Sequence, residues 1–240
     1  MKIRFLNPGE VPPEYGAAAD AAIFKEVSEE RSPPTLLIYS RNRPTVSLGR
    51  FRNPEEDIRT ELIEESDVSV VRRISGGSSV LTGTSQLVYS LTIKDVYKNR
   101  SESYFEICKC VRSAVESLGI DTVFKEPNDI LANGRKISGS AQYRAKGFLL
   151  QHGTIIIEPE PLLDIILKPV KDRSYPGTTS LSECLNRNVS KHEIIPALRE
   201  SFEKGLEAEL YDGSFTETEK EFISSVREEF KVSVSGLSDP

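Results

Sequence analysis

The chain has 240 residues, of which 38% are hydrophobic and 28% are charged, and its formal net charge is −6. This length and composition are typical of a globular protein with one large core or two small ones. Clustered lysine and arginine hold nucleic-acid backbones, so this acidic chain is not expected to bind nucleic acid. The N-terminus has no apolar signal core, and no window approaches 18 apolar residues. We therefore expect no membrane association either.

The cysteines and histidines restrict the chemistry further. Cys108, Cys110 and Cys184 lack the spacing of a secreted disulfide framework or a metal site. Only His152 and His192 are available as imidazole ligands. The sequence therefore predicts a reduced, cytoplasmic protein without structural zinc.

Predicted helices and strands alternate irregularly along the chain, without internal repeats, which favours an α+β or mixed α/β fold. Helices are predicted at residues 14–30, 53–67 and 101–120, and strands at residues 35–40, 44–51 and 68–74. We expect a meander of three strands from residue 123 to 157, and helical segments from residue 159 to about 230. No linker longer than a loop interrupts the pattern, so residues 1–240 are expected to form a single domain.

Asn133-Gly134 is the strongest hairpin signal in the chain, because both residues tolerate the positive φ angles of a type I′ turn. If these two residues form the whole turn, Asp129 lies opposite Ser138. Directly opposed residues share a face and successive residues alternate. Asp129, Lys136 and Ser138 are therefore expected on one face of the sheet.

Small residues follow the lysine of this hairpin. Gly139, Ser140 and Ala141 leave the sheet surface open, so an anionic ligand would fit close to the Lys136 ammonium. The alternative is an exposed cross-strand ion pair between Lys136 and Asp129, because such pairs are common and weak.

A second stretch, residues 70–83 ("VVRRISGGSSVLTG"), reads as a strand that runs into two arginines and a glycine-rich loop. Glycines let backbone N–H groups approach phosphate oxygens, and arginine supplies bidentate donors for phosphate or carboxylate. The alternative is a glycine turn with solvated arginines.

Together the two stretches resemble the lipoate-protein ligase A family, within the biotin and lipoate ligase superfamily. The signatures that carry the resemblance are the strand and Ser-Gly-Gly loop of Arg72 to Ser90, Asn128-Asp129, Gly134-Arg135-Lys136, Gly139-Ser140-Ala141 and His152-Gly153-Thr154. Their order and spacing agree with the family, and the resemblance covers about Gly16 to Phe202. It implies an α+β catalytic domain of the class II biotin/lipoate ligase type, with mixed, largely antiparallel β-sheets flanked by helices.

The resemblance also implies an activity and a set of site residues. Family members use ATP and Mg²⁺ to adenylate lipoate or octanoate. They then pass the acyl group to a lysine of a lipoyl carrier domain, of the 2-oxoacid dehydrogenase E2 or the glycine-cleavage H-protein type. By position, Lys136 would be the catalytic lysine between the acyl carboxylate and the α-phosphate, and Asp129 would lie near Mg²⁺. The residues expected to bind substrate or nucleotide are Arg73, Ser75, Gly76, Gly77, Ser78, Ser79, Val80, Leu81, Asn128, Asp129, Ser138, Gly139, Ser140, His152 and Gly153.

The chain also departs from the ligase pattern. Many ligases have His-Asp and then Gly-Asn after the glycine-rich loop, whereas this chain has Thr82-Gly83 and Ser85-Gln86. The sequence of this chain is closer here to the pattern of octanoyltransferases. Related transferases carry the acyl group on a cysteine that precedes the hairpin, whereas this chain has "VFKEPNDIL" there. We expect first an ATP-dependent ligase, second an acyltransferase that works between carrier proteins without ATP, and third a non-catalytic carrier-binding module.

The C-terminal part suggests a partner. Long members of the resembled family carry an accessory domain after the catalytic one, but only about 40 residues follow Phe202 here, too few for a second core. We expect no separate accessory domain in this chain. We expect either a separately encoded small accessory subunit or a short form that works alone.

Overall fold

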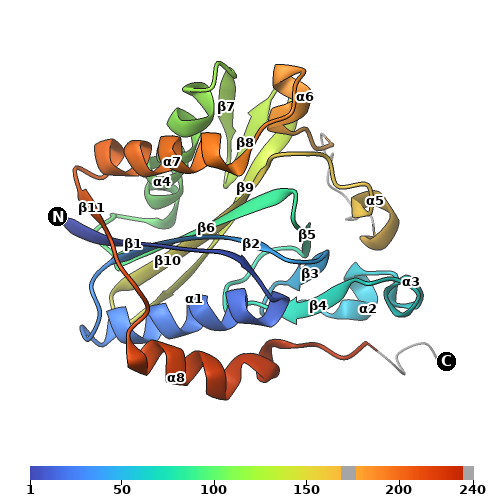
Figure 1. Ribbon diagram of the computed structural model, residues 1–240, viewed down its shortest axis with the longest axis horizontal. Helices are drawn as coiled ribbons and strands as arrows, with labels where there is room; N and C mark the ends of the chain where they lie inside the picture. The colour runs from blue at the N-terminus through green and yellow to red at the C-terminus, as the bar shows by residue number, and fades with distance from the viewer. Residues whose placement is uncertain (169–176, 235–240) are drawn as a thin grey trace.

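Two β-sheets form the frame of the protein in a computed structural model that describes residues 1–168 and 177–234 (Figure 1). The strands are β1 (Lys2–Val11), β2 (Thr35–Arg41), β3 (Thr45–Leu48), β4 (Ser69–Arg72), β5 (Val80–Thr82), β6 (Gln86–Lys94), β7 (Thr122–Lys125), β8 (Asp129–Ala132), β9 (Arg135–Ala145), β10 (Phe148–Ile156) and β11 (Glu209–Asp212). The large sheet has the order β11-β1-β2-β6-β10-β9-β8-β7, and the small sheet the order β4-β3-β5. β1 runs parallel to both of its neighbours, and the other neighbours in the large sheet are antiparallel.

Helices cover both faces of the large sheet. The helices of the described chain are α1 (Pro13–Ser28), α2 (Pro54–Asp57), α3 (Thr60–Glu64), α4 (Arg100–Glu116), α5 (Leu163–Ile166), α6 (Leu181–Leu185), α7 (Lys191–Gly205) and α8 (Glu217–Val226), followed by the 3₁₀ helix η1 (Arg227–Phe230). α4 and α7 lie on one face and α1 and α8 on the other (Figure 1). The expected α+β class with mixed, largely antiparallel sheets is confirmed.

The pattern of apolar residues explains how α4 is placed. Asn99 caps its first turn, because its side chain accepts a hydrogen bond from the backbone N–H of Glu102. Ile107, Val111 and Ala114 recur at helical spacing and are completely buried against the large sheet, as the sequence predicts.

Helix α1 carries the feature that leads to the site. Ala18 and Ala22 are fully buried and let the helix lie close to the sheet. Asp20 occupies the same buried side and is only 2% exposed. A carboxylate in such surroundings requires hydrogen-bond partners.

Several predicted elements are wrong in extent. The expected helix over residues 53–67 is two short helices, α2 and α3, because the extended residue Ile58 turns fully into the core between them. The expected three-strand meander has four strands, since β7 precedes the hairpin. The sequence analysis did not predict β1 or β11, and β11 interrupts the expected C-terminal helices.

The predicted hairpin forms, but its register shifts. Asn133 and Gly134 have φ angles of 50° and 73°, and Leu131 lies opposite Lys136 as expected. An irregularity then places Asp129 opposite Gly139, so that Ser138 lies opposite the core residue Ile130. The expectation that Ser138 shares the face of Asp129 and Lys136 is therefore wrong, and Ser138 is 1% exposed.

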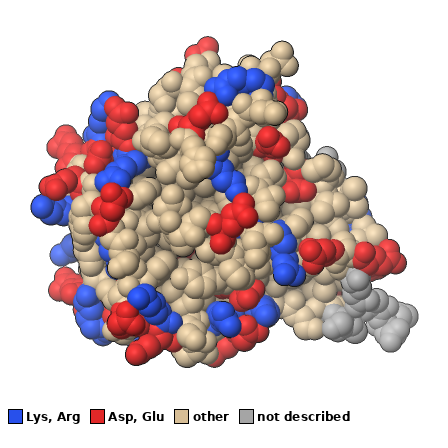
Figure 2. Space-filling view, viewed as in Figure 1, with Lys and Arg blue, Asp and Glu red and all other residues tan. Residues whose placement is uncertain are grey.

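Charged side chains of both signs are interspersed on the face shown in Figure 2. Within the described residues no helix combines the length and the apolar character that crossing a membrane requires.

A buried ion pair joins the N-terminal strand to α8. Nη1 and Nη2 of Arg4 donate to the two carboxylate oxygens of Glu219 at 3.0 and 2.5 Å, and the Ser32 hydroxyl donates to the same carboxylate at 3.0 Å. Arg4 and Glu219 are 4% and 0% exposed, so each charge depends on the other for its stability in the interior.

We predict that Glu219→Ala lowers the free energy of unfolding by about 3–5 kcal/mol, because it leaves the Arg4 guanidinium buried without a counter-charge. Urea unfolding followed by circular dichroism measures the loss. Glu217→Ala is the matched control on the same helix, since the Glu217 side chain is 81% exposed. Equal effects of the two substitutions would contradict the assignment.

Candidate functional site

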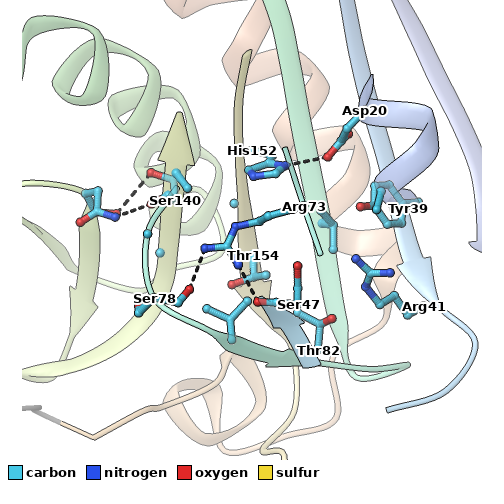
Figure 3. A pocket seen from close by; sticks show the side chains of 18 of the residues that line it. Asp20, Tyr39, Arg41, Ser47, Arg73, Ser78, Thr82, Ser140, His152 and Thr154 are labelled. Carbon is cyan, nitrogen blue, oxygen red and sulfur yellow. Dashed lines mark hydrogen bonds and ion pairs between the residues drawn. The ribbon is translucent and has the colours of Figure 1, made fainter. Parts of the chain in front are cut away.

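A pocket lies between the two sheets, beside the glycine-rich loop that connects β4 to β5 (Figure 3). Ten of the residues predicted for the site line it: Arg73, Gly77, Ser78, Val80, Asn128, Lys136, Gly139, Ser140, His152 and Gly153. The six others do not line it: Ser75, Gly76, Ser79, Leu81, Asp129 and Ser138. The structure thus brings together most of the residues selected from the sequence, although they come from three separate strands and two loops.

Lys136 and Asp129 form an ion pair at the edge of this pocket. The distance between Lys136 Nζ and Asp129 Oδ1 is 2.6 Å, and the lysine side chain is 20% exposed. Gly139 provides the space for it, because a Cβ atom at this position would overlap the end of the Lys136 side chain. Asn128 and Ser140, next to this pair, are joined by backbone and side-chain hydrogen bonds.

Arg73 is buried, and its guanidinium holds the glycine-rich loop from within. Its Nη1 donates to the carbonyl oxygen of Ser47 at 2.6 Å, and its Nη2 donates to those of Gly76 at 2.8 Å and Ser78 at 2.6 Å. Burial, with a smaller contribution from the nearby charge of Arg41, lowers the pKa of Arg73 to about 10, so the side chain is still a cation at neutral pH. The expected contact of Arg73 with a nucleotide stays a prediction.

A chain of hydrogen bonds connects Arg73 to α1. Nε of Arg73 donates to Ser75 Oγ at 3.1 Å, and Ser75 Oγ lies 2.6 Å from Nε2 of His152. Nδ1 of His152 lies 2.6 Å from Oδ2 of Asp20 (Figure 3). Ser75, His152 and Asp20 are 0%, 7% and 2% exposed, so the chain runs through the interior.

Other contacts fix the two ends of the loop. The backbone N–H of Arg50 donates to the carbonyl oxygen of Ser75 at 2.8 Å, and Gly49 lies so close to Gly77 that a side chain would overlap its carbonyl group. At the far end, the Ser79 hydroxyl donates to Asp57.

Asp57 is held in turn by the guanidinium of Arg52, whose Nε lies 2.8 Å from Oδ2. Burial alone would raise the pKa of Asp57, but the hydrogen bonds from Arg52 and Ser79 and the charge of Arg52 lower it below its usual value. Asp57 therefore anchors the loop as a carboxylate.

Ala141 was expected beside the ligand and lines the pocket, but other lining residues were not predicted from the sequence: Ala17, Asp20, Tyr39, Arg41, Ser47, Thr82, Val88 and Thr154. Arg41 matters most among them for the charge of the pocket. It is 3% exposed, Nη1 donates to the carbonyl of Pro13, and its buried Nε has no acceptor among the described residues. Its only sequence signal was a charge at the end of a strand, which is usually a solvated residue.

The balance of charges in the pocket is positive, although the chain as a whole is acidic. Arg41, Arg73 and Lys136 line it, whereas Asp20 is the only acidic residue in the described lining. Asp20 is hydrogen-bonded to His152, and the carboxylate paired with Lys136 is not part of the lining. Such a pocket suits an anionic ligand.

None of the three cysteines lines this pocket. Cys108 and Cys110 lie on α4 within the core, where burial raises their thiol pKa values to about 11 and about 12. Cys184 lies on α6, and its Sγ is 4.0 Å from Nδ2 of Asn133. The buried thiols are neutral at physiological pH and are poor nucleophiles.

The described residues contain no group of three or more acidic, histidine or cysteine side chains that would hold a metal ion by itself. Asp129 is the single carboxylate beside the pocket that was expected near Mg²⁺, and Lys136 already neutralises it. An ion there would depend on oxygen ligands from a bound phosphate, as Mg²⁺ often does.

Comparison with known proteins identifies related sequences. The sequence model of one family, the lipoyl protein ligase A/B catalytic domain, matches residues 12–203. Octanoyltransferase LipM of Geobacillus kaustophilus is 30% identical over 93% of this chain and 93% of the relative. Octanoyltransferase LipM of Halalkalibacterium halodurans is 29% identical over 94% of this chain and 95% of the relative.

Solved structures share the fold. Lipoate-protein ligase A bound with ATP has a TM-score of 0.85 and 22% identity, over 95% of both chains. A bi-partite lipoate protein ligase from Thermoplasma acidophilum has a TM-score of 0.84 and 22% identity, over 95% of this chain and 92% of that chain. At such identities the likeness establishes the architecture alone.

We predict that Gly139→Ala weakens binding of an anionic ligand by about 10-fold or more, because the new methyl group displaces the Lys136 ammonium. Calorimetric titration with ATP and lipoate measures the affinity, and thermal unfolding checks the fold. In a Lys136→Ala background the same substitution should change the affinity for the ligand little, because the ammonium that it displaces is already absent. Additive losses in the double variant would contradict this explanation.

Proposed function

Because this chain belongs to the lipoyl protein ligase A/B catalytic-domain family, we propose that it is a lipoate- or octanoate-protein ligase that forms an acyl-adenylate from ATP. The family resemblance found in the sequence is confirmed, and the chain is an enzyme of the lipoate ligase and octanoyltransferase group. The choice between ligase and transferase is our proposal.

In the proposed first step, a carboxylate oxygen of the acid attacks the α-phosphorus of ATP, and pyrophosphate leaves. In this proposal the Lys136 ammonium would neutralise the charge that develops between the carboxylate and the α-phosphate. Arg41 and the N–H groups of the glycine-rich loop would bind the remaining phosphate oxygens. The positive balance of the pocket supports this assignment, because both reactants are anions.

In the second step, the amine of a carrier lysine attacks the acyl carbonyl, an amide bond forms and AMP leaves. Lys136 would polarise the same carbonyl oxygen during this attack. The acyl chain needs an apolar surface, and Ala17, Val80 and Val88 provide apolar lining in this pocket. We therefore place the chain of the acid along these three residues.

Mg²⁺ would accompany ATP, and Asp129 is the residue of this chain that fits it as a single carboxylate ligand. The ion would supply charge neutralisation for the phosphates. Its role at Asp129 stays a prediction.

The observation that carries the ligase assignment is the absence of a usable thiol, because all three cysteines lie within the described residues and none lines the pocket. Cysteine-dependent acyl transfer requires a thiolate that reaches the acyl carbonyl. The buried thiols of Cys108 and Cys110 have raised pKa values and do not fit this role.

An ATP-independent acyltransferase is the second candidate. The related proteins from G. kaustophilus and H. halodurans favour it, since both are octanoyltransferases. Such an enzyme would take an octanoyl group from one carrier protein and pass it to another without ATP.

The expected partner is a lipoyl carrier domain of the E2 or H-protein type. The T. acidophilum ligase is described together with its E2 lipoyl domain and as bi-partite. We propose a lipoyl domain as the acceptor for this chain as well. The small accessory subunit, the cytoplasmic location and the single-domain organisation stay predictions.

We predict that replacing Cys108, Cys110 and Cys184 by alanine leaves ATP-dependent modification of a lipoyl domain within about 3-fold of the wild-type rate, because no thiol takes part in the proposed reaction. Lys136→Ala should lower the same rate by about 100-fold or more, because a preorganised charge is lost. Intact-mass measurement of the lipoyl domain follows the reaction.

The controls separate the two candidates. Lys2→Ala removes a lysine that is 72% exposed on β1 of the same sheet, away from the pocket, and should have no effect. Each variant is also assayed with octanoyl carrier protein in place of acid and ATP. If the cysteine-free variant folds but is inactive, a thiol takes part in the reaction. The ligase proposal would then be wrong, and the transferase would take its place.

A further inference from the structure

We propose that Asp20 is a positioning residue that holds the glycine-rich loop in its ligand-binding shape through His152, Ser75 and Arg73. The three links measure 2.6, 2.6 and 3.1 Å, and all four side chains are at least nine-tenths buried. The proposal rests on the proposed function only for the identity of the ligand.

The orientation of the peptide groups explains what the chain of hydrogen bonds achieves. Arg73 draws the carbonyl oxygens of Gly76 and Ser78 toward its Nη2. In a trans peptide the N–H points opposite to the C=O, so the N–H groups of Gly77 and Ser79 point away from Arg73.

The two N–H groups then differ in their surroundings. That of Ser79 points to Asp57, whose carboxylate it helps to stabilise. That of Gly77, a residue of the pocket lining, has no acceptor among the described residues. It is therefore a donor available to a phosphate or carboxylate oxygen.

The buried position of Asp20 lowers the stability of the fold, which argues for a role beyond packing. It lies on the helix face formed by buried alanines, and its Oδ1 has no hydrogen-bond partner among the described residues. A buried carboxylate with an unsatisfied oxygen destabilises a fold. Alanine, which α1 has on both sides of this position, would fill it at lower cost.

The partner at Nδ1 assigns a hydrogen to this atom of His152, because a carboxylate can only accept. Asp20 accepts from Nδ1–H, so in the neutral ring Nε2 is left to accept the Ser75 hydroxyl proton. Ser75 Oγ then accepts from Arg73 Nε–H. Asp20 thus orients His152, His152 orients Ser75, and Ser75 orients Arg73. This holds the guanidinium of Arg73 so that its Nη2 reaches the carbonyl oxygens of Gly76 and Ser78.

The test compares Asp20→Ala, the isosteric Asp20→Asn and Ser75→Ala in the full chain. Amide hydrogen exchange at Ser79, the loop residue whose N–H is bonded to Asp57, should quicken by about 10-fold or more in Asp20→Ala and Ser75→Ala, because each change removes a link. Nitrogen-15 spectra should find His152 as the Nδ1–H tautomer in wild type and in Ser75→Ala, with more Nε2–H tautomer in Asp20→Ala. The exposed His192, the second of the two histidines, is the internal reference.

Steady-state kinetics adds a functional readout. The KM for ATP should rise by about 10-fold in Asp20→Ala, because the loop donors lose their orientation. Asp95→Asn is the matched control, since it alters a partly buried carboxylate that pairs with Arg144, away from the loop. It should change neither exchange in the loop nor the KM.

Two outcomes would overturn the proposal. One is wild-type exchange at Ser79 in both Asp20→Ala and Ser75→Ala. The other is a His152 tautomer that does not respond to Asp20→Ala. If Asp20→Ala does not fold, Asp20→Asn and Ser75→Ala decide the question. Failure of the ligase proposal would instead appear as a wild-type chain without ATP-dependent activity, with the exchange and tautomer results unaffected.

Discussion

The site depends on a buried guanidinium that forms no ion pair within the described part of the chain. Arg73 shares its N–H groups among the carbonyls of Ser47, Gly76 and Ser78, and this ties the small sheet to the glycine-rich loop. Because burial disfavours the cation, the loop carbonyls and the Ser75 hydroxyl have to replace its hydration. The Arg73 guanidinium therefore both shapes the loop and contributes to the positive charge of the pocket.

Glycines make this arrangement sterically possible. Gly139 leaves room for the Lys136 ammonium, and Gly49 allows the β3–α2 connection to touch the loop at Gly77. At Gly153 a Cβ atom would come within 2.7 Å of the Gly139 carbonyl oxygen and within 2.6 Å of the Tyr89 hydroxyl. Larger residues at these positions would force apart the strands that carry the site.

Local patterns in the sequence predicted much of this protein. The amphipathic spacing of α4, the Asn133-Gly134 turn and the glycine-rich loop are confirmed, because each depends on neighbours in the chain. The register beyond Leu131 could not be predicted, since the irregularity in β9 has no strong residue signal. Asp20 and Arg41 were missed because their roles arise from contacts across the fold. Without an alignment, a single sequence holds no record of such contacts.

Acid-dependent exchange of labelled pyrophosphate into ATP is the decisive measurement for the ligase activity, because it reports adenylate formation without a carrier protein. A ligase of this kind should show exchange that requires lipoate or octanoate, is lost in Lys136→Ala and persists when all three cysteines are replaced. Absence of exchange with every acid, together with octanoyl transfer between carrier proteins without ATP, would contradict the ligase proposal.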